Sequence, residues 1–397
     1  MKILHINAGS LNSGSGRGVY WLHQALLKNG VKSKILCSEY DGADENVITP
    51  EKKNTYSKKI EKFLHKYVFF ASKNFHTNHF GLDVKKYECY KWADIIHLHW
   101  INGLIGNSNI SCIDKPIVWT LRDMWALTGG CFYSLDCDKW KKNCIQCPEI
   151  GSKLPVSLIN QTIKKEKFDS KIVYVAISDW LRTKAKDSSV LKNNEVLHIP
   201  NSINLELFSY DEYFKQRFPF IKDNDFVISV GAQNLKDMYK GGAILIDLLN
   251  AINFKTVVLC FGNSNIQNEI SNKHIRFFYL GFVDDNTICS VYSASNVFLM
   301  TSTMEAFGKT VVESLACGTP VICFDKTAPA EIITSMKDGI IVNRNSIPEF
   351  MQALLFIKHK KKIYFFRRCV QKSKQYDSVR IAKEYSYLYQ KMYVRRF

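Results

Sequence analysis

The stretch that decides the fold is Ser302–Pro320, which reads Ser-Thr-Met-Glu-Ala-Phe-Gly-Lys-Thr-Val-Val-Glu-Ser-Leu-Ala-Cys-Gly-Thr-Pro. One short apolar run, Asn296–Met300, precedes it, and a second, Pro320–Phe324, follows it. This order predicts a strand, a loop that enters a helix near Gly308, a helix end at Gly318, and another strand. The free N–H groups at such a helix start, together with the helix dipole, suit a diphosphate.

The same alternation of strand and helix patterns runs through the whole chain. Helical patterns are predicted at Gly18–Asn29, Ala243–Ile252 and, rich in lysine and aromatic residues, Thr55–His79. Alternation of this kind is typical of parallel α/β architecture, and two successive doubly wound units are the simplest account. The predicted strands are Lys2–Asn7, Ser33–Cys37, Ile95–His99, Ile117–Leu121, Ile172–Ala176, Asp225–Gly231, Thr256–Phe261, Ile275–Leu280, Asn296–Met300 and Pro320–Phe324.

A domain boundary is predicted near Ile199–Asn204, where Pro200 and two asparagines break the periodicity. We therefore expect one domain over residues 1–200 and a second over residues 201–377. Residues 378–397 form an amphipathic helical pattern that either packs on its own domain or crosses back to the first.

The chain carries 54 Lys and Arg against 37 Asp and Glu, a formal net charge of +17. Such an excess favours anionic partners, although it also serves plain solubility. The basic residues form scattered runs interleaved with aromatic residues, which fit an anionic membrane surface better than a nucleic-acid groove. No apolar run reaches the roughly 18 residues of a spanning helix, so the expected location is the cytoplasm, with association at the inner membrane face left open. The runs are Lys52–Lys73, Lys139–Lys142, Lys164–Lys171 and Lys358–Lys374.

Two glutamates in the deciding stretch have the chemistry of a sugar-nucleotide site. Glu313 lies about one turn inside the predicted helix, where its carboxylate can accept hydrogen bonds from ribose hydroxyls, and Glu305 lies on the loop, within reach of a sugar hydroxyl. Two glutamates eight positions apart are common on their own. Their full context, Glu-Ala-Phe-Gly, then Glu, then Ala-Cys-Gly-Thr-Pro-Val, resembles the donor-site signature of the retaining glycosyltransferases of family 4. That resemblance implies the GT-B fold, in which two Rossmann-like domains face each other across a cleft.

The resemblance covers essentially the whole chain, and it assigns the acceptor side to residues 1–200 and the nucleotide-sugar donor to residues 201–377. Lys240 would neutralise the leaving diphosphate. The arginine usual in that loop is missing, with Gln233 or Asn234 in its place, and Lys236 or Lys309 is a candidate substitute. The donor-binding residues that the resemblance implies are Gly231, Lys240, Phe282, Val283, Ala306, Phe307, Gly308, Lys309, Thr310 and Glu313.

In the first domain, Gly16, Arg17 and Gly18 resemble the loop that closes over the donor phosphates, with Arg17 as a candidate cation. Arg122 and Asp123 stand where related sequences have His-Asp before Met-Trp. Together with Glu305 and Lys240 they are the candidate catalytic residues. Arginine can donate hydrogen bonds but cannot act as a base, which argues against a mechanism centred on histidine. His97 and His99, at the end of a strand, either point into the cleft or are satisfied histidines in a turn.

Four of the twelve cysteines lie close together at Cys131, Cys137, Cys144 and Cys147. They admit a structural zinc ion, disulfides or free thiols, and none of these makes the cluster catalytic. With the neighbouring Thr-Leu-Arg-Asp-Met-Trp they resemble a subgroup, including colanic-acid-type transferases, that works in bacterial surface polysaccharide assembly.

The sequence thus predicts a retaining hexosyltransferase that moves a sugar from a nucleotide-diphosphate donor to a hydroxyl of a lipid-linked glycan, in O-antigen, capsule or exopolysaccharide biosynthesis. No cofactor is expected to be required for catalysis, because no Asp-x-Asp motif stands at a suitable strand end and a helix start with Lys240 can replace a divalent ion. Two alternatives are a nucleotide-sugar epimerase of the same fold and a zinc-bearing basic nucleic-acid-binding protein. The paired-domain pattern with Glu305 and Glu313 favours the transferase, and we do not expect nucleic acid as a partner.

Overall fold

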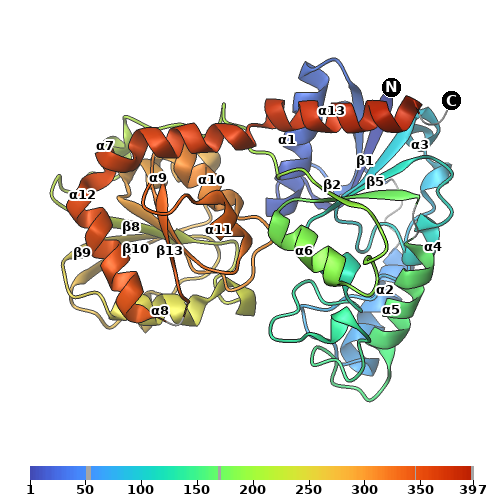
Figure 1. The fold of residues 1–397 in the computed structure, drawn as a ribbon, viewed down its shortest axis with the longest axis horizontal. Coiled ribbons are helices and arrows are strands. Elements are labelled where there is room, and N and C mark those ends of the chain that lie inside the picture. The colour runs from blue at the N-terminus through green and yellow to red at the C-terminus, as the bar shows by residue number, and fades with distance from the viewer. Residues whose placement is uncertain (51–54, 169–170, 345, 395–397) are drawn as a thin grey trace. The chain divides into compact units, whose positions relative to one another are not determined.

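The computed structural model describes every residue except 51–54, 169–170, 345 and 395–397 (Figure 1). The chain divides into two compact units: Met1–Ser202 together with Ser378–Phe397, and Ile203–Asp377. Parts of the predicted basic runs 52–73 and 164–171, and the last residues of the predicted C-terminal helix, lie outside the described residues. No helix in the described part of the chain is both long enough and apolar enough to cross a membrane.

The first unit is built on a seven-stranded parallel sheet in the order β3-β2-β1-β4-β5-β6-β7. The five strands predicted for this half are present. Two further short edge strands, β3 and β7, were not predicted, because two or three residues carry too little pattern to detect. The strands are β1 (Lys2–Ser10), β2 (Lys32–Glu39), β3 (Val47–Ile48), β4 (Ile95–Leu98), β5 (Ile117–Leu121), β6 (Ile172–Ala176) and β7 (Val196–His198).

Helices cover this sheet, and one of them departs from the prediction. The expected helix Thr55–His79 is wrong in length: α2 ends at Phe63 and a π-helical turn, Leu64–Val68, follows it. Phe70 then takes a positive φ of 49°, which ends the helical path. The other helices of the unit are α1 (Gly14–Lys28), α3 (Glu88–Trp92), α4 (Asn107–Ile110), α5 (Val156–Lys167), α6 (Asp179–Asp187) and α13 (Ser378–Val394).

The helix α13 completes the core of the first unit by packing beside α1 (Figure 1). Its buried residues Ile381, Tyr385 and Leu388 join one hydrophobic cluster with Ile3 of β1 and Val118 of β5. Burying an apolar side chain of this size stabilises a fold by about 1.5–3 kcal/mol. The first unit therefore depends on residues from both ends of the chain.

The second unit is built on a six-stranded parallel sheet in the order β10-β9-β8-β11-β12-β13. All five predicted strands are present, and β13 is additional. The α/β doubly wound class predicted from the sequence is confirmed in both units. The strands are β8 (Val227–Gly231), β9 (Thr256–Phe261), β10 (Ile275–Gly281), β11 (Val297–Met300), β12 (Val321–Phe324) and β13 (Gly339–Val342), and the helices are α7 (Phe214–Arg217), α8 (Gly242–Asn250), α9 (Asp285–Ala294), α10 (Lys309–Ala316), α11 (Ala328–Ile332) and α12 (Ile347–Ser373).

Candidate functional site

The loop between β11 and α10 carries the residues to which the sequence gives most weight. Gly308 has a φ of 93°, a left-handed conformation that favours glycine, and α10 begins at the next residue, Lys309. A Cβ on Gly308 would lie 2.9 Å from the Pro329 ring. Gly318, at φ 75°, directly follows the C-cap Cys317. The predicted loop, helix start and helix end are confirmed.

Lys240 and Glu305 form an ion pair at this edge of the second sheet. The Lys240 Nζ lies 2.6 Å from the Glu305 Oε2, and the two side chains are only 18% and 15% exposed. They come from the loops that follow the adjacent strands β8 and β11. Because β8 and β11 are neighbours in the sheet, two residues far apart in sequence lie together at the carboxyl ends of the strands. This is where α/β proteins bind ligands.

The two loops that carry this pair are also tied through the backbone. Thr303 donates its N–H to the Tyr239 carbonyl at 2.8 Å, and the Thr301 hydroxyl donates to the Lys240 carbonyl at 3.2 Å. Gly241 has a φ of 67°, and a Cβ there would lie 2.0 Å from the Thr301 carbonyl oxygen. Glycine is therefore required at position 241 for this close approach of the two loops.

The remaining predicted donor residues of this unit differ in how accessible they are. Glu313 is only 4% exposed, and its carboxylate lies 3.5 Å from the Tyr292 hydroxyl. Phe282, which directly follows β10, is 76% exposed, although a large apolar side chain gains from burial. Gly231 ends β8, Val283 follows Phe282, Ala306 and Phe307 are buried, and Thr310 lies in the first turn of α10.

Arg122 and Asp123 lie directly after β5 in the first unit. Arg122 donates one hydrogen bond to the Asn201 Oδ1 at 2.6 Å and one to the His99 Nδ1 at 3.0 Å. Loss of solvent around the guanidinium lowers the pKa of Arg122 to about 10. Burial likewise raises the pKa of Asp123 to about 6, although its Oδ1 accepts a hydrogen bond from the Trp125 N–H at 2.8 Å.

A small open pocket lies beside these two residues. Asn102 lines it, is 6% exposed, and has no hydrogen-bond partner for either amide atom. A buried amide without a partner costs free energy, about 1–3 kcal/mol, so this side chain is set up to meet a polar ligand or water. His99, Arg122 and Asp123 also line the pocket, which makes it a polar site at the carboxyl ends of β4 and β5.

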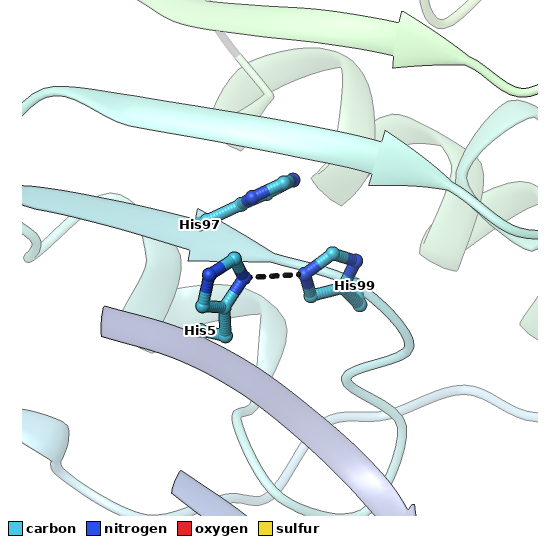
Figure 2. A group of neighbouring side chains, drawn as sticks. All are labelled: His5, His97 and His99. Atoms are coloured by element: carbon cyan, nitrogen blue, oxygen red, sulfur yellow. Dashed lines mark hydrogen bonds between the residues drawn. The ribbon is translucent and has the colours of Figure 1, made fainter. Parts of the chain in front are cut away.

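Three histidines, His5 of β1, His97 of β4 and His99 just after β4, lie close together on one face of the first sheet (Figure 2). The His5 Nδ1 lies 3.0 Å from the His99 Nε2, and burial lowers the pKa of all three imidazoles well below its usual range. Because Arg122 can only donate, its bond to the His99 Nδ1 places the His99 proton on Nε2, where it is donated to His5.

His97 is bonded on both ring nitrogens. The Tyr389 hydroxyl lies 2.6 Å from Nδ1 and the Thr120 hydroxyl lies 2.7 Å from Nε2. Of the two interpretations of His97 and His99, the structure supports satisfied, buried histidines. Their ligand atoms lie within 4.8 Å of one another, but the hydrogen bonds and the adjacent Arg122 charge disfavour a metal ion there.

Gly16, Arg17 and Gly18 lie in the opening turns of α1, which begins at Gly14, four residues earlier than predicted. The Ser13 hydroxyl caps this helix by accepting from the Gly16 N–H at 3.2 Å. A Cβ on Gly18 would lie 2.9 Å from the Asn201 Oδ1 and 3.2 Å from Arg122 Nη1. Gly18 thus makes room for the Arg122–Asn201 hydrogen bond. Arg17 lies over the Trp21 ring, with its guanidinium carbon 4.7 Å from the ring centroid.

The four clustered cysteines line one small pocket, and none of them forms a disulfide. The Cys144 sulfur accepts the Gly129 N–H at 3.3 Å. Among the described residues, the three histidines above are the one group of three potential ligands within 4.8 Å, so no three of these thiols are as close together. The sulfur atoms converge on a pocket without closing around an ion.

The part of the chain that holds this site is similar to a known protein family. Residues 211–375, which include the Lys240–Glu305 pair and α10, match the family model described as "Glycosyl transferases group 1". Over residues 211–375, which are less than half of the chain, this protein is similar to the group 1 glycosyltransferases.

The proteins to which parts of this chain are similar include proteins named for bacterial surface polysaccharide synthesis. The chain is 24% identical over 173 residues to the putative colanic acid biosynthesis glycosyl transferase WcaC of Escherichia coli, which is 40% of this chain and 42% of that protein. It is 26% identical over 174 residues, 41% of this chain and 46% of that protein, to the N-acetylgalactosamine-N,N'-diacetylbacillosaminyl-diphospho-undecaprenol 4-alpha-N-acetylgalactosaminyltransferase of Campylobacter jejuni. Both matches thus span less than half of the relative's length.

The likeness in fold extends over the whole chain. The structure of Anabaena HepE in complex with UDP-glucose matches with a TM-score of 0.64 and 16% identity, covering 98% of this chain and all of that one. Each unit is a Rossmann-like domain, and the fold of the chain is the GT-B fold, as the sequence predicts.

Sequence reasoning missed two residues beside Arg122 and Asp123. Asn102 follows the His-Leu-His-Trp segment. Its position just after a strand, as a polar residue, is the only feature of the sequence that could have marked it as a site residue. Lys164 of α5 is fully buried, donates to the Trp125 and Thr128 carbonyls, and has a pKa lowered to about 7 by burial. The surrounding basic run gives no indication that Lys164, unlike its neighbours, has a buried side chain.

Proposed function

We propose that this protein is a retaining glycosyltransferase that transfers a hexosyl group from a nucleotide-diphosphate sugar to a hydroxyl of a lipid-linked glycan in bacterial surface polysaccharide synthesis. The observation that carries the proposal is the enclosed Lys240–Glu305 pair, 2.6 Å apart, beside the start of α10 within the residues that match the group 1 family model. An ammonium group and free helix N–H groups offer a diphosphate two kinds of positive partner.

The residues of the second unit divide the donor between them in this proposal. The diphosphate binds Lys240 and the N–H groups of Gly308 and Lys309. Gly308, in a left-handed conformation directly before α10, has no side chain that would block the approach of the diphosphate. Glu313 accepts from the ribose hydroxyls, and the exposed Phe282 ring offers an apolar face to the base. HepE, which shares the fold, was solved with UDP-glucose, and this supports a nucleotide-sugar donor.

The transfer step exchanges one bond at the anomeric carbon for another. The bond from C1 to the diphosphate oxygen breaks, the acceptor oxygen bonds to C1 from the same face, and its proton passes to the leaving diphosphate. Lys240 stabilises the charge that grows on the diphosphate, and Glu305 positions Lys240 and a sugar hydroxyl. The relative from Campylobacter jejuni has an undecaprenol diphosphate in its name, and this supports a lipid-linked acceptor.

In this proposal, Arg122 and Asp123 of the first unit serve as positioning donors and acceptors for the reacting sugar. Asp123 has a pKa raised to about 6, so it is mostly ionised at neutral pH and can accept a hydroxyl proton in a hydrogen bond. Arg17 is the further cation proposed for the donor phosphates.

Thermal stabilisation by a panel of nucleoside diphosphates and nucleotide sugars tests the donor site. One nucleotide series should raise the melting temperature of the wild type, because a ligand of the native state shifts the equilibrium by mass action. Lys240→Ala and Glu313→Ala should lose that response. Lys255→Ala is the matched control, since Lys255 is exposed at the opposite, amino end of β9 and should keep the response. A wild type that responds to no nucleotide would overturn the proposal.

A further inference from the structure

The segment Lys59–Phe70 turns its apolar side chains outward. Ile60, Phe63, Tyr67 and Phe70 are 47%, 57%, 55% and 62% exposed, and we call these four residues the apolar stripe. Ile60, Phe63 and Tyr67 recur three and four positions apart along the end of α2 and the π-helical turn. Phe70 follows that turn, at the point where its positive φ ends the helical path. The Phe63 and Tyr67 rings lie 5.3 Å apart, so the stripe is continuous there.

The acidic residue of this segment points the other way. Glu61 is 4% exposed, and its Oε1 accepts from the Thr77 hydroxyl at 2.9 Å and from the His79 N–H at 3.1 Å. An amphipathic helix of a soluble protein normally buries its apolar residues and exposes its charges. Here a carboxylate is buried and the aromatic residues face solvent, so none of the exposed side chains between residues 59 and 73 is acidic. A carboxylate of a neighbouring loop, Glu149, accepts from the Ser72 hydroxyl at the far end of this segment.

Lysines border the apolar stripe. Lys59, Lys62, Lys66 and Lys73 are all exposed, and the Lys66 Nζ lies 4.8 Å from the centroid of the Tyr67 ring. A long lysine side chain can lie along an apolar surface while its ammonium group reaches phosphate groups beside it. Aromatic residues with lysines on one surface are the composition that binds the interface of an anionic membrane.

A neighbouring loop extends this surface. The Gly151 and Ser152 N–H groups donate to the Phe70 and Phe69 carbonyls, each at 3.2 Å. The next residues, Lys153 and Leu154, are exposed, with Leu154 at 50%. The pairing thus brings a second apolar and basic element alongside the end of the stripe.

We propose that the apolar stripe and its lysines are the surface by which this protein binds the interface of an anionic lipid bilayer. The charge decides between occupants: a second copy would oppose its own lysines across a twofold axis, whereas anionic headgroups neutralise them. The apolar rings enter the headgroup region and the ammonium groups contact lipid phosphates. The inference deepens the proposed function, on which it rests for its purpose, since a lipid-linked acceptor lies in that membrane.

Vesicle flotation of the full-length protein tests the proposal with two lipid compositions, phosphatidylcholine alone and phosphatidylcholine mixed with phosphatidylglycerol. The wild type should bind the anionic vesicles and bind the neutral ones weakly. Lys62→Ala with Lys66→Ala should weaken binding about 30-fold, the change that corresponds to about 1 kcal/mol for each lysine. Phe63→Ser should weaken it about tenfold or more. Leu207→Ser is the matched control, because Leu207 is 41% exposed, lies beside Glu206 and outside the basic runs, and should leave binding unchanged.

The outcomes separate this inference from the donor site. A Phe63→Ser variant that keeps its nucleotide-dependent stabilisation but loses vesicle binding supports a membrane surface on a folded protein. Equal binding to both vesicle types, or unchanged binding by the lysine variant, would overturn the inference, as would a concentration-dependent dimer abolished by Phe63→Ser. Loss of the nucleotide response with vesicle binding intact would count against the donor site alone.

Discussion

The Lys240 ammonium and the Glu305 carboxylate, 65 residues apart in sequence, lie 2.6 Å from each other and are largely screened from solvent. Each is proposed to serve the donor, Lys240 its diphosphate and Glu305 its sugar. Their pairing means that the lysine is held in place, and its charge partly neutralised, before a ligand arrives. A binding diphosphate must then share the lysine with the carboxylate.

Glu305→Gln should therefore separate binding from transfer. Removing the carboxylate charge leaves Lys240 free for the diphosphate, so nucleoside diphosphate affinity should stay equal or rise. Sugar transfer should fall by about 10²–10³-fold, because the amide holds neither the lysine nor the sugar hydroxyl in the same way. Calorimetric titration and donor turnover would check this. Lys240→Ala should lower both quantities, and equal losses of affinity in the two variants would contradict the division of roles.

Gly241→Ala should destabilise the second unit more than Gly281→Ala. Both glycines have positive φ, 67° and 70°, but a Cβ at 241 would clash with the Thr301 carbonyl and a Cβ at 281 meets nothing within 4 Å. Gly281→Ala should therefore lose about 1 kcal/mol of unfolding free energy from backbone strain, and Gly241→Ala distinctly more. Chemical denaturation would measure the two values. Equal losses would show that the loops can separate without cost.

Acidification from pH 7 to pH 5 should destabilise the first unit. Burial lowers the pKa of His65 and His76 to about 4, and that of His5, His97 and His99 well below 6.5. Below about pH 6.5 the unfolded chain takes up protons that the folded chain refuses, so stability is lost as the pH falls. Melting temperatures across this range would test it. His97→Gln should flatten part of the slope, whereas His359→Gln, on an exposed face of α12, should not.

The zinc hypothesis for the cysteine pocket predicts one zinc ion per chain in elemental analysis of the purified protein. Binding would draw the four sulfur atoms together, since zinc holds thiolates at about 2.3 Å. Cys144→Ser should abolish the metal and lower the melting temperature, and Cys112→Ser, exposed and outside the pocket, should do neither. Twelve titratable thiols and no metal in the denatured wild type would show that the pocket holds free cysteines.

The sequence predicts the sheets better than it predicts side-chain partners. Ile117–Leu121, Ile172–Ala176 and Thr256–Phe261 were predicted to the residue, because parallel strands buried on both faces are continuous apolar runs. The helix expected over Thr55–His79 is too long, because its lysine and aromatic pattern continues past Phe70, where a positive φ ends the helical path. The same pattern does not reveal that Glu61 turns inward. That orientation is set by Thr77 and by the His79 backbone, which come from the following loop.

The candidate site shows the same limit. Motif context singles out Lys240 and Glu305 separately, yet their contact follows from the strand order, which places β8 beside β11. The Asn102 amide has no hydrogen-bond partner because no side chain or backbone group from elsewhere in the described fold comes close enough to it. The residues next to Asn102 in the sequence do not predict this.

The packing of α13 on the first unit bears on how the chain is made. Tyr389 bonds to His97, and Tyr385 bonds to Thr120, so the first unit lacks part of its interior until α13, which follows the second unit in sequence, has been synthesised. Domains otherwise tend to fold as they leave the ribosome, beginning with the N-terminal one. In this chain the second unit emerges whole before the first can close. Until α13 has emerged, His97 lacks the Tyr389 hydroxyl and the core of the first unit lacks the side chains of this helix.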